Sequence, residues 1–381
     1  MSTETSTDYR AALEAVIAGT IAPAAAEVDR AGTYPRAALD ALGAAGILGL
    51  LSATEVGGGG GTLGDAAEVI EQIAAACGST AMVVLMHYAA TCVLEAHGPR
   101  EVREAIARGE HVSSLAFSEA GSRSHFWAPV STATGDGAVV RLDARKSWIT
   151  SAGEADSYVW SSRPLAADGP MTLWLVPADA DGLRVAGQFD GVGLRGNASR
   201  PVVAEGVEVP REAMLGDDGA GLDIALGTAL PAFLTGNAAF SVGLTTALLD
   251  EAATHLTNTR LEHLDQTLAE QPVARAEYAR LRTRGDEARA FLADTLGALA
   301  SGRADATLRV LQVKAVASEV SSEVADGVMR LCGGAAFRKE LGVERRFRDT
   351  LAARVMAPTT PALRDFVGRA TLGLPLFGGP R

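Results

Sequence analysis

Apolar residues recur at helical spacing through the first hundred residues of the chain. From Tyr9 to about Arg108 the sequence is rich in alanine and leucine, and its apolar positions are three or four residues apart. This spacing gathers apolar side chains on one face of a helix. Examples are Ala38, Leu39, Leu42, Ala45 and Leu48. We predict a helical N-terminal domain over residues 1–111.

Strand signals replace the helical pattern between residues 112 and 218. Short runs of β-branched and aromatic residues, such as residues 171–176 before Pro177, are separated by Gly, Pro and Asp. Strand patterns that follow one another without helical patterns between them favour antiparallel pairing. We predict an antiparallel β sandwich or barrel for this middle domain.

The helical pattern returns in a third domain, predicted over residues 219–381. It separates apolar from charged positions as in a long helix of a bundle. The apolar stripe consists of Leu308, Leu311, Ala315, Val324, Val328 and Leu331. The charged residues expected outside this stripe are Arg309, Lys314, Glu319 and Glu323. The predicted fold class is α+β: an N-terminal helical domain, a central antiparallel β domain and a C-terminal four-helix bundle.

An uncharged stretch over residues 224–249 is long enough to cross a bilayer, which requires about 20 apolar residues. Pro231, Asn237, Ser241 and several threonines interrupt its apolar character. A central helix surrounded by other helices of a soluble protein has the same pattern. We therefore expect a buried helix here and no membrane span.

Charge and composition exclude several classes of partner. The chain has 46 acidic and 34 basic residues and a net charge of −12, which repels nucleic acid backbones and anionic membranes. Cys77, Cys92 and Cys332 form no CxxC pair, and the histidines show no HxxxH spacing. We expect no metal site and no disulfide framework. The polar N-terminus lacks the features of a secretion signal, so the expected location is the cytoplasm.

Several short segments follow one another in a fixed order along nearly the whole chain. They are residues 76–81 (ACGSTA), 116–124 (AFSEAGSRS), 146–152 (KSWITSA), 193–196 (GLRG), 207–210 (VEVP), 332–334 (CGG) and 344–349 (ERRFRD). Together these segments resemble the acyl-CoA dehydrogenase superfamily, and matches spread in this order are more specific than any one of them alone.

The resemblance implies a bound FAD whose ring lies between the β domain and the C-terminal bundle. Ser118 and Thr150 match residues that hydrogen-bond the flavin, and Trp148 matches one that covers its ring, although a tryptophan alone would be read as a core residue. The other positions implied to contact the cofactor are Arg260, Gly333, Gly334 and Thr359. Arg260 would reach the FAD of a neighbouring subunit, but a solvated surface arginine is an equal alternative. Relatives form homotetramers, so a homo-oligomer is expected.

The resemblance also implies an acyl thioester substrate, carried by CoA or by a carrier protein. Ser124 matches a serine near the acyl tail. His87, in a helix expected to face that tail, could hydrogen-bond a polar substrate, and the alternative is a core histidine whose hydrogen bonds are satisfied internally. Electrons would pass to an electron-transfer partner.

The family's catalytic glutamate has no counterpart at either of its usual positions. One position, eight residues after Asp349, is Ala357, and the other is Phe233. A positioned base contributes about 10²–10⁴-fold in rate, so its loss requires a replacement or a different reaction. The backbone N–H of Ala357 survives the substitution and could still polarise the thioester carbonyl.

His125 is the candidate replacement, because an imidazole can accept or donate a proton at neutral pH. It stands where the family usually has aspartate, and packing within its loop is the alternative role. Three functions remain open: a dehydrogenase with His125 as the base; a flavin-dependent monooxygenase using FAD or FMN from a flavin reductase; and a non-catalytic protein that binds an acyl group or flavin. Arg330, where relatives carry glutamine, could pair with a phosphate or with an acidic side chain.

Overall fold

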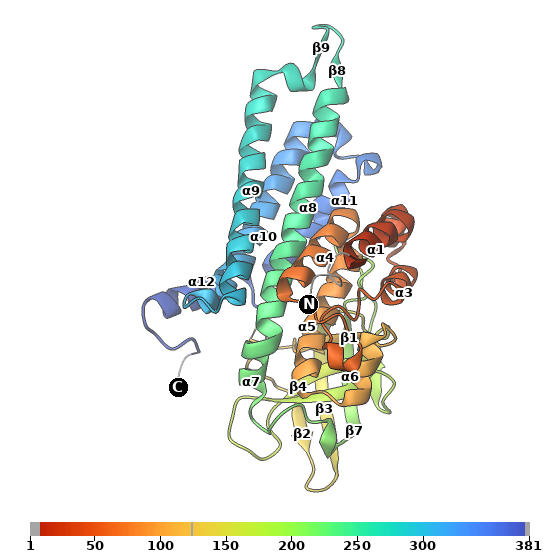
Figure 1. Ribbon diagram of the computed structural model, residues 1–381, viewed down its shortest axis with the longest axis vertical. Helices are drawn as coiled ribbons and strands as arrows, with labels where there is room; N and C mark the ends of the chain where they lie inside the picture. The colour runs from red at the N-terminus through yellow and green to blue at the C-terminus, as the bar shows by residue number, and fades with distance from the viewer. Residues whose placement is uncertain (1–7, 123–124, 378–381) are drawn as a thin grey trace. The chain divides into compact units, whose positions relative to one another are not determined.

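The computed structural model describes residues 8–122 and 125–377, with helices toward both ends of the sequence and strands between them (Figure 1). These residues form two compact units. The first contains the described residues up to Val69, together with Ser79–Gly191 and Arg195–Phe233. The second contains Ile70–Gly78, Val192–Leu194 and the described residues from Leu234 onward.

The N-terminal part of the first unit is helical, as its apolar spacing predicts. Leu39 and Leu42 of α3 (Arg36–Ala44) are buried on the predicted apolar face, but the helix ends at Ala44, so Ala45 and Leu48 lie beyond it. α5 (Gly78–His97) is buried on nearly all sides, consistent with its mostly apolar sequence. The helices are α1 (Asp8–Val16), η1 (Ile17–Ile21), α2 (Ala22–Ala31), α3 (Arg36–Ala44), η2 (Thr54–Val56), α4 (Leu63–Ala76, continuing into the second unit), α5 (Gly78–His97) and α6 (Arg100–Ala107).

Two sheets form the β part of the first unit. One has the order β1-β4-β5 and the other β2-β3-β7-β6. Pairing is antiparallel except between β1 and β4, which run parallel. The strands are β1 (Ser113–Ala116), β2 (Thr132–Thr134), β3 (Val139–Ile149), β4 (Ser157–Ser162), β5 (Thr172–Pro177), β6 (Leu183–Val185) and β7 (Arg200–Pro210).

The core of this β part lies between side chains of both sheets. In β3 buried and exposed residues alternate, so Val140, Leu142 and Ala144 point inward. Trp160 of β4 and Trp174 of β5 are opposite each other and fully buried. The arrangement is a sandwich with inward-facing apolar residues from each sheet.

Short helices connect the strands of the first unit to the long helices of the second. They are η3 (Arg211–Ala213), α7 (Gly221–Ile224) and η4 (Ala225–Ala229). The second unit contains α8 (Leu230–Asn258) from Leu234 onward, β8 (Arg260–Leu261), β9 (Gln266–Thr267), η5 (Leu268–Glu270), α9 (Pro272–Ala300), α10 (Ala306–Cys332), η6 (Gly333–Ala335), η7 (Lys339–Leu341), α11 (Val343–Val355) and α12 (Thr360–Thr371).

The long helices of the second unit run beside one another as a bundle (Figure 1). Gly285 of α9 faces Leu249 and Thr245 of α8, and Gly327 of α10 lies against Leu281 of α9. At Gly327 an added Cβ would collide with the Leu281 side chain, so glycine allows the close approach of these helices. α11 and α12 both pack against α10.

Three helices of the described chain are long and apolar enough to cross a membrane by length and composition alone: Tyr9–Ala31, Gly78–His97 and Gly221–Asn258. In Gly221–Asn258, 94% of the most apolar window is buried inside the protein. This agrees with the buried helix predicted for residues 224–249. The observed architecture confirms the predicted fold class.

One prediction about the bundle is wrong. Lys314 was expected outside the apolar stripe of α10, but its side chain is fully buried. The reason is that its ammonium group donates hydrogen bonds to the carbonyls of Met356 and Pro358, far along the chain, which a helical repeat does not reveal.

Candidate functional site

Trp148 is held in an exposed position near the end of β3. Its side chain is 70% exposed, and its backbone has φ of 58°. Pairing with β7 shifts register between Lys146 and Ile149, where β3 takes three steps against two on β7. This bulge turns a large aromatic side chain outward, where its ring makes an edge contact with Phe189 at 6.5 Å between ring centroids. Positive φ at a non-glycine residue costs about 1–3 kcal/mol and often marks a functional site.

Hydrogen bonds to a neighbouring segment fix the backbone that follows Trp148. The N–H of Ser151 donates to the Asn197 carbonyl at 3.0 Å. Thr150 and Ser199 share a hydroxyl–hydroxyl bond of 3.2 Å, and Thr150 is buried. The Tyr34 hydroxyl also donates to Ser151 Oγ at 3.0 Å. The strained conformation therefore belongs to a rigid part of the unit, not to a mobile loop end.

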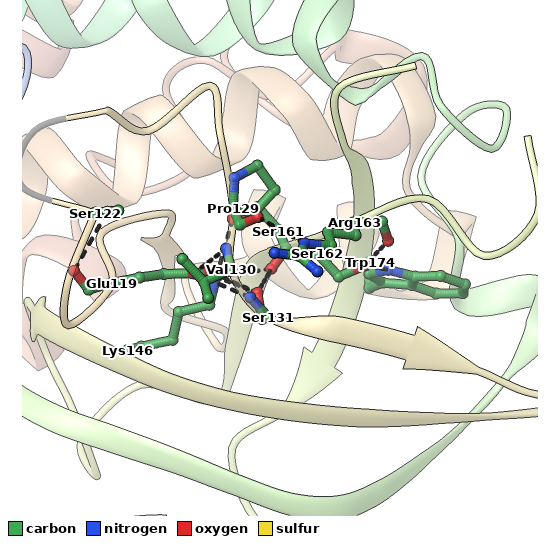
Figure 2. Close-up of polar contacts among 10 residues, drawn as sticks. All are labelled: Glu119, Ser122, Pro129, Val130, Ser131, Lys146, Ser161, Ser162, Arg163 and Trp174. Atoms are coloured by element: carbon green, nitrogen blue, oxygen red, sulfur yellow. Dashed lines mark hydrogen bonds and ion pairs between the residues drawn. The ribbon is translucent and has the colours of Figure 1, made fainter. Parts of the chain in front are cut away.

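A buried ion pair joins the two segments that the resemblance assigns to the cofactor (Figure 2). Lys146 Nζ lies 2.6 Å from Glu119 Oε1, and both side chains are almost fully buried. Lys146 also donates to the Ser161 carbonyl at 2.7 Å and to Ser161 Oγ at 2.9 Å. The Ser147 N–H donates to the Ser118 carbonyl at 3.0 Å. We call Glu119, Ser131, Lys146 and Ser161 the buried clasp.

Glu119 also closes the loop that carries His125. Its carboxylate accepts hydrogen bonds from the backbone N–H groups of Val130 and Ser131 and from the Ser131 hydroxyl. Figure 2 shows these donors converging on Glu119 from the returning end of the loop. The Glu119 carboxylate therefore joins the two ends of the loop, near Ala120 and Val130.

The charges of the clasp are consistent with an ion pair near neutral pH. Burial opposes ionisation of the Glu119 carboxyl, but the Lys146 ammonium and the donated hydrogen bonds outweigh it and lower its pKa. Burial lowers the pKa of Lys146 to about 8, although the Glu119 charge counteracts this effect. A Trp160 ring centroid 5.0 Å from Nζ adds a cation–π contact.

His125 is exposed on this loop, and its hydrogen bond defines which ring nitrogen is available. Nδ1 lies 2.9 Å from the Ser122 carbonyl, which can only accept, so Nδ1 carries a proton and donates. In the neutral ring Nε2 then holds the lone pair. The Trp127 ring meets the imidazole edge-on at 4.9 Å. Ser124, the predicted neighbour of the acyl tail, lies outside the described residues.

His87 has the contacts of a core histidine. It is fully buried in α5, and Nε2 lies 3.0 Å from the Leu48 carbonyl. Nδ1 accepts from the Ser113 N–H at 3.3 Å, so both ring nitrogens are engaged by the backbone. Burial lowers the pKa of His87 to about 4, which favours the neutral ring. Of the two predicted roles, this geometry favours the structural one.

In the second unit, Lys314 is hydrogen-bonded to the turn that contains Ala357. The turn connects α11 to α12, and Lys314 lies on α10. Lys314 Nζ donates to the carbonyls of Met356 and Pro358, each at 2.8 Å. These two carbonyls flank Ala357. Burial lowers the pKa of Lys314 to about 7. Among the described residues, none accepts a hydrogen bond from the Ala357 N–H.

The segment before this turn is tied to the Gly193-Leu194 stretch. Asp349 Oδ1 accepts a hydrogen bond from the Leu194 N–H at 2.6 Å, and Arg348 donates to the Val192 carbonyl at 3.0 Å. An added Cβ on Gly193 would collide with the Arg348 carbonyl. Two of the matched sequence segments therefore meet in space within this unit.

The remaining predicted cofactor positions are spread over the second unit. Arg260 of β8 is exposed and paired with Asp265, and Arg330 of α10 is paired with Asp326 at 3.2 Å. Gly333 and Gly334 are exposed, and no atom lies within 4 Å of a Cβ built on either. Thr359 caps the start of α12. In Figure 1, β8 is at the opposite end of the long helices from α12.

Comparison with known proteins identifies the family. Residues 3–109 match the N-terminal domain of acyl-CoA dehydrogenases, residues 114–207 the middle domain and residues 219–372 the C-terminal domain. The chain belongs to the acyl-CoA dehydrogenase family. It is 27% identical to the mitochondrial short-chain specific acyl-CoA dehydrogenase of Bos taurus over 90% of this chain and 84% of that protein.

Solved structures share the fold of this family member. Butyryl-CoA dehydrogenase from Megasphaera elsdenii has a TM-score of 0.90 at 22% identity, covering 98% of this chain and 99% of that chain. The prolyl acyl carrier protein oxidase AnaB has a TM-score of 0.88 at 19% identity, covering 98% of this chain and 100% of that chain.

Members of the acyl-CoA dehydrogenase family are flavin oxidoreductases that use FAD, and residues of this chain fit that cofactor. Trp148 offers an open aromatic face on a backbone locked by hydrogen bonds. Gly333 and Gly334 leave their backbone open to a close approach by a ligand.

Sequence reasoning missed the residues that hold these segments in place. Lys146 carried a signal, because it occupies an inward position in the alternating pattern of β3. The partners Glu119, Ser131 and Ser161 come from other segments and had no comparable signal. Lys314 gave no signal beyond its place beside the apolar stripe of α10.

Proposed function

We propose that this flavin oxidoreductase acts on an acyl thioester, carried by CoA or by a carrier protein, with FAD as its cofactor. The observation that carries the proposal is Trp148, an exposed aromatic side chain held outward by a strained and hydrogen-bonded backbone. Because the Trp148 side chain is 70% exposed, it packs little against the sandwich, whereas it could cover a flavin ring. When bound, FAD supplies the two-electron acceptor for the β-hydrogen of the substrate.

The chain supplies the groups that would act on the thioester. The Ala357 N–H would donate a hydrogen bond to the thioester carbonyl and stabilise the negative charge that develops on its oxygen. His125 would accept the α-proton at Nε2, which its hydrogen bond to Ser122 leaves with the lone pair. The clasp supports this role because Glu119 closes the loop that carries His125.

An anaerobic titration tests the proposal. The FAD-loaded protein is mixed with acyl-CoA and acyl carrier protein thioesters of increasing chain length, and flavin bleaching is followed by absorbance. We expect bleaching by at least one thioester, and a rate reduced about 10²-fold or more in His125→Gln. His263→Gln, at an exposed histidine between β8 and β9, is the matched control. Flavin that stays oxidised with every thioester would remove this proposal.

The apolar residues at both glutamate positions favour a second candidate, a flavin-dependent monooxygenase. Ala357 and Phe233 offer no carboxylate, and oxygenation by reduced flavin and O₂ requires no α-proton acceptor. A flavin reductase would then supply reduced FMN or FAD. Thioester-dependent O₂ consumption with the reductase present, without anaerobic bleaching, would select this candidate. A purified protein that cannot be loaded with flavin would instead indicate a non-catalytic role.

We also propose a homo-oligomer inside the cell, with an electron-transfer protein as partner for the dehydrogenase reaction. Mass photometry of the flavin-loaded protein tests the oligomer. Electron transfer is tested by reduction of an added electron-transferring flavoprotein in the presence of a thioester that bleaches the flavin.

A further inference from the structure

Lys314 is in an unusual position for a lysine. It lies on α10 with its side chain fully buried, and its Nζ donates to two backbone carbonyls of the turn between α11 and α12. A buried ammonium loses its hydration, so it requires strong hydrogen-bond acceptors in return. The Met356 and Pro358 carbonyls provide them, and each lies 2.8 Å away.

The hydrogen bond from Lys314 to the Met356 carbonyl also fixes the direction of the Ala357 N–H. The Met356 carbonyl and the Ala357 N–H belong to one planar peptide group, and this peptide is trans. In a trans peptide the C=O and N–H point in opposite directions. Because Lys314 holds the carbonyl, the Ala357 N–H must point away from Lys314. The second bond, to Pro358, holds the other side of Ala357 and prevents rotation of the turn.

The same contact changes the strength of the N–H as a donor. A cation at a peptide oxygen withdraws electrons through the amide and makes the N–H a stronger hydrogen-bond donor. The Ala357 N–H has no acceptor among the described residues, so its donor capacity is available for a ligand.

We propose that Lys314 is a positioning residue that aims and polarises the Ala357 N–H as the hydrogen-bond donor to the thioester carbonyl. This inference rests on the proposed acyl thioester chemistry for its ligand. The aiming of the amide itself is a property of the chain alone. It assigns a role in the reaction to a side chain that does not touch the substrate.

The sequence offers a direct probe of this peptide group. Met356-Ala357 is the one place in the chain where alanine follows methionine. Labelling methionine with ¹³C at the carbonyl and alanine with ¹⁵N therefore gives one NMR cross-peak between the two labels, that of the Ala357 amide. The experiment compares wild type, Lys314→Met, Lys314→Gln and Lys339→Met in the FAD-loaded, full-length protein. Lys339 is an exposed lysine of the same unit and provides the matched control.

We expect Lys314→Met to move the Ala357 amide proton upfield, Lys314→Gln to restore part of the shift, and Lys339→Met to leave it unchanged. In a second arm, butyryl-CoA labelled with ¹³C at its carbonyl is bound to each variant. Its carbonyl stretch in difference infrared spectra should be lowered in wild type and return toward the free value in Lys314→Met. Flavin reduction at saturating butyryl-CoA should fall by about 10- to 100-fold in Lys314→Met, with a smaller change in affinity.

The outcomes separate the two proposals. An Ala357 signal that is identical in wild type and Lys314→Met overturns the role of Lys314, whatever the thioester does. A lower melting temperature of Lys314→Met with an unchanged amide signal assigns Lys314 a purely structural role. If the amide moves in Lys314→Met but neither butyryl-CoA nor any other thioester perturbs the wild-type signal, the aiming of the amide is supported and the proposed function fails.

Discussion

Lys146 lies in the β sandwich of the first unit with a carboxylate against its ammonium, whereas Lys314 lies in the helical bundle with two backbone carbonyls against its own. Both side chains are fully buried, and both hold a segment to which we assign a role in the proposed function. In the sandwich the segments are those of Ser118 and Trp148. In the bundle the segment is the turn at Ala357.

The difference shows what each lysine can do. Beside Glu119, the charge of Lys146 is balanced, so the clasp is a fixed element that joins two segments. Two backbone carbonyls accept hydrogen bonds from Lys314, and burial lowers its pKa further, to about 7 against about 8 for Lys146. The Lys314 ammonium contacts the carbonyl oxygen of the Met356–Ala357 peptide group directly, so its charge can polarise that group.

The largest effect, on the rate of flavin reduction, is expected from a carboxylate introduced at Ala357 in the bundle. The sandwich already has a buried carboxylate, that of Glu119. Ala357→Glu places a carboxylate on the turn that Lys314 holds, at the position where we predict the missing base. If FAD and thioester bind as in relatives, the anaerobic rate of flavin bleaching by butyryl-CoA should rise about 10²–10⁴-fold. Stopped-flow absorbance measures this rate. Ala357→Gln, which has the same shape without the charge, is the control. An unchanged rate in Ala357→Glu would show that the thioester binds in a different pose.

Removing the ammonium from the sandwich should cost the most stability. Lys146→Met leaves Glu119 buried without its cation, and the free energy of unfolding should fall by about 3–5 kcal/mol. Urea unfolding followed by tryptophan fluorescence measures the change. The control is Arg141→Met on the same strand, where the Arg141–Glu208 pair is exposed and should contribute at most about 1 kcal/mol. Equal losses in the two variants would mean that the clasp behaves as a surface pair.

Local patterns predicted the fold, because each element depends on residues close to it in sequence. Leu39 and Leu42 are buried as their helical spacing indicates, and Val140 and Leu142 alternate with exposed residues as in a half-buried strand. These patterns reflect only which face of an element is covered. They were therefore sufficient for the helical ends and the strand-rich middle of the chain.

The candidate site was predicted less completely, because its contacts join segments far apart in sequence. Trp148 and Thr150 were found through a motif, but the motif does not reveal the positive φ that exposes the indole. Glu119 and Lys146 were quoted within motifs without their pairing. Lys314 was placed outside the apolar stripe, because a lysine on a helix is usually solvated and its two carbonyl partners follow it by more than forty residues.

A smaller effect is expected in the pH dependence of the free energy of unfolding, through the buried Lys314. The pKa of Lys314 is lowered to about 7 in the fold from a usual value of 10.5. The unfolded chain therefore binds more protons between these values, and stability from this group rises as pH increases from about 7 to about 10. In this window the free energy of unfolding of wild type should increase relative to that of Lys314→Met by at most about 1.4 kcal/mol per pH unit. Urea unfolding at each pH gives the difference, and a flat difference would show that Lys314 stays charged throughout.

The smallest effect is expected from removing the exposed Trp148 side chain on the surface of the sandwich. Trp148→Ala removes an exposed indole from a strained backbone, so we expect the free energy of unfolding of the flavin-free protein to stay within about 0.5 kcal/mol of wild type. Affinity for FAD should fall by about tenfold, because an aromatic stacking contact contributes about 0.5–1.5 kcal/mol beyond the area it buries. Fluorescence titration with FAD measures the affinity. Val192→Ala, at another exposed apolar residue, is the control. Loss of stability with unchanged affinity would mean that Trp148 supports the sandwich and does not bind the cofactor.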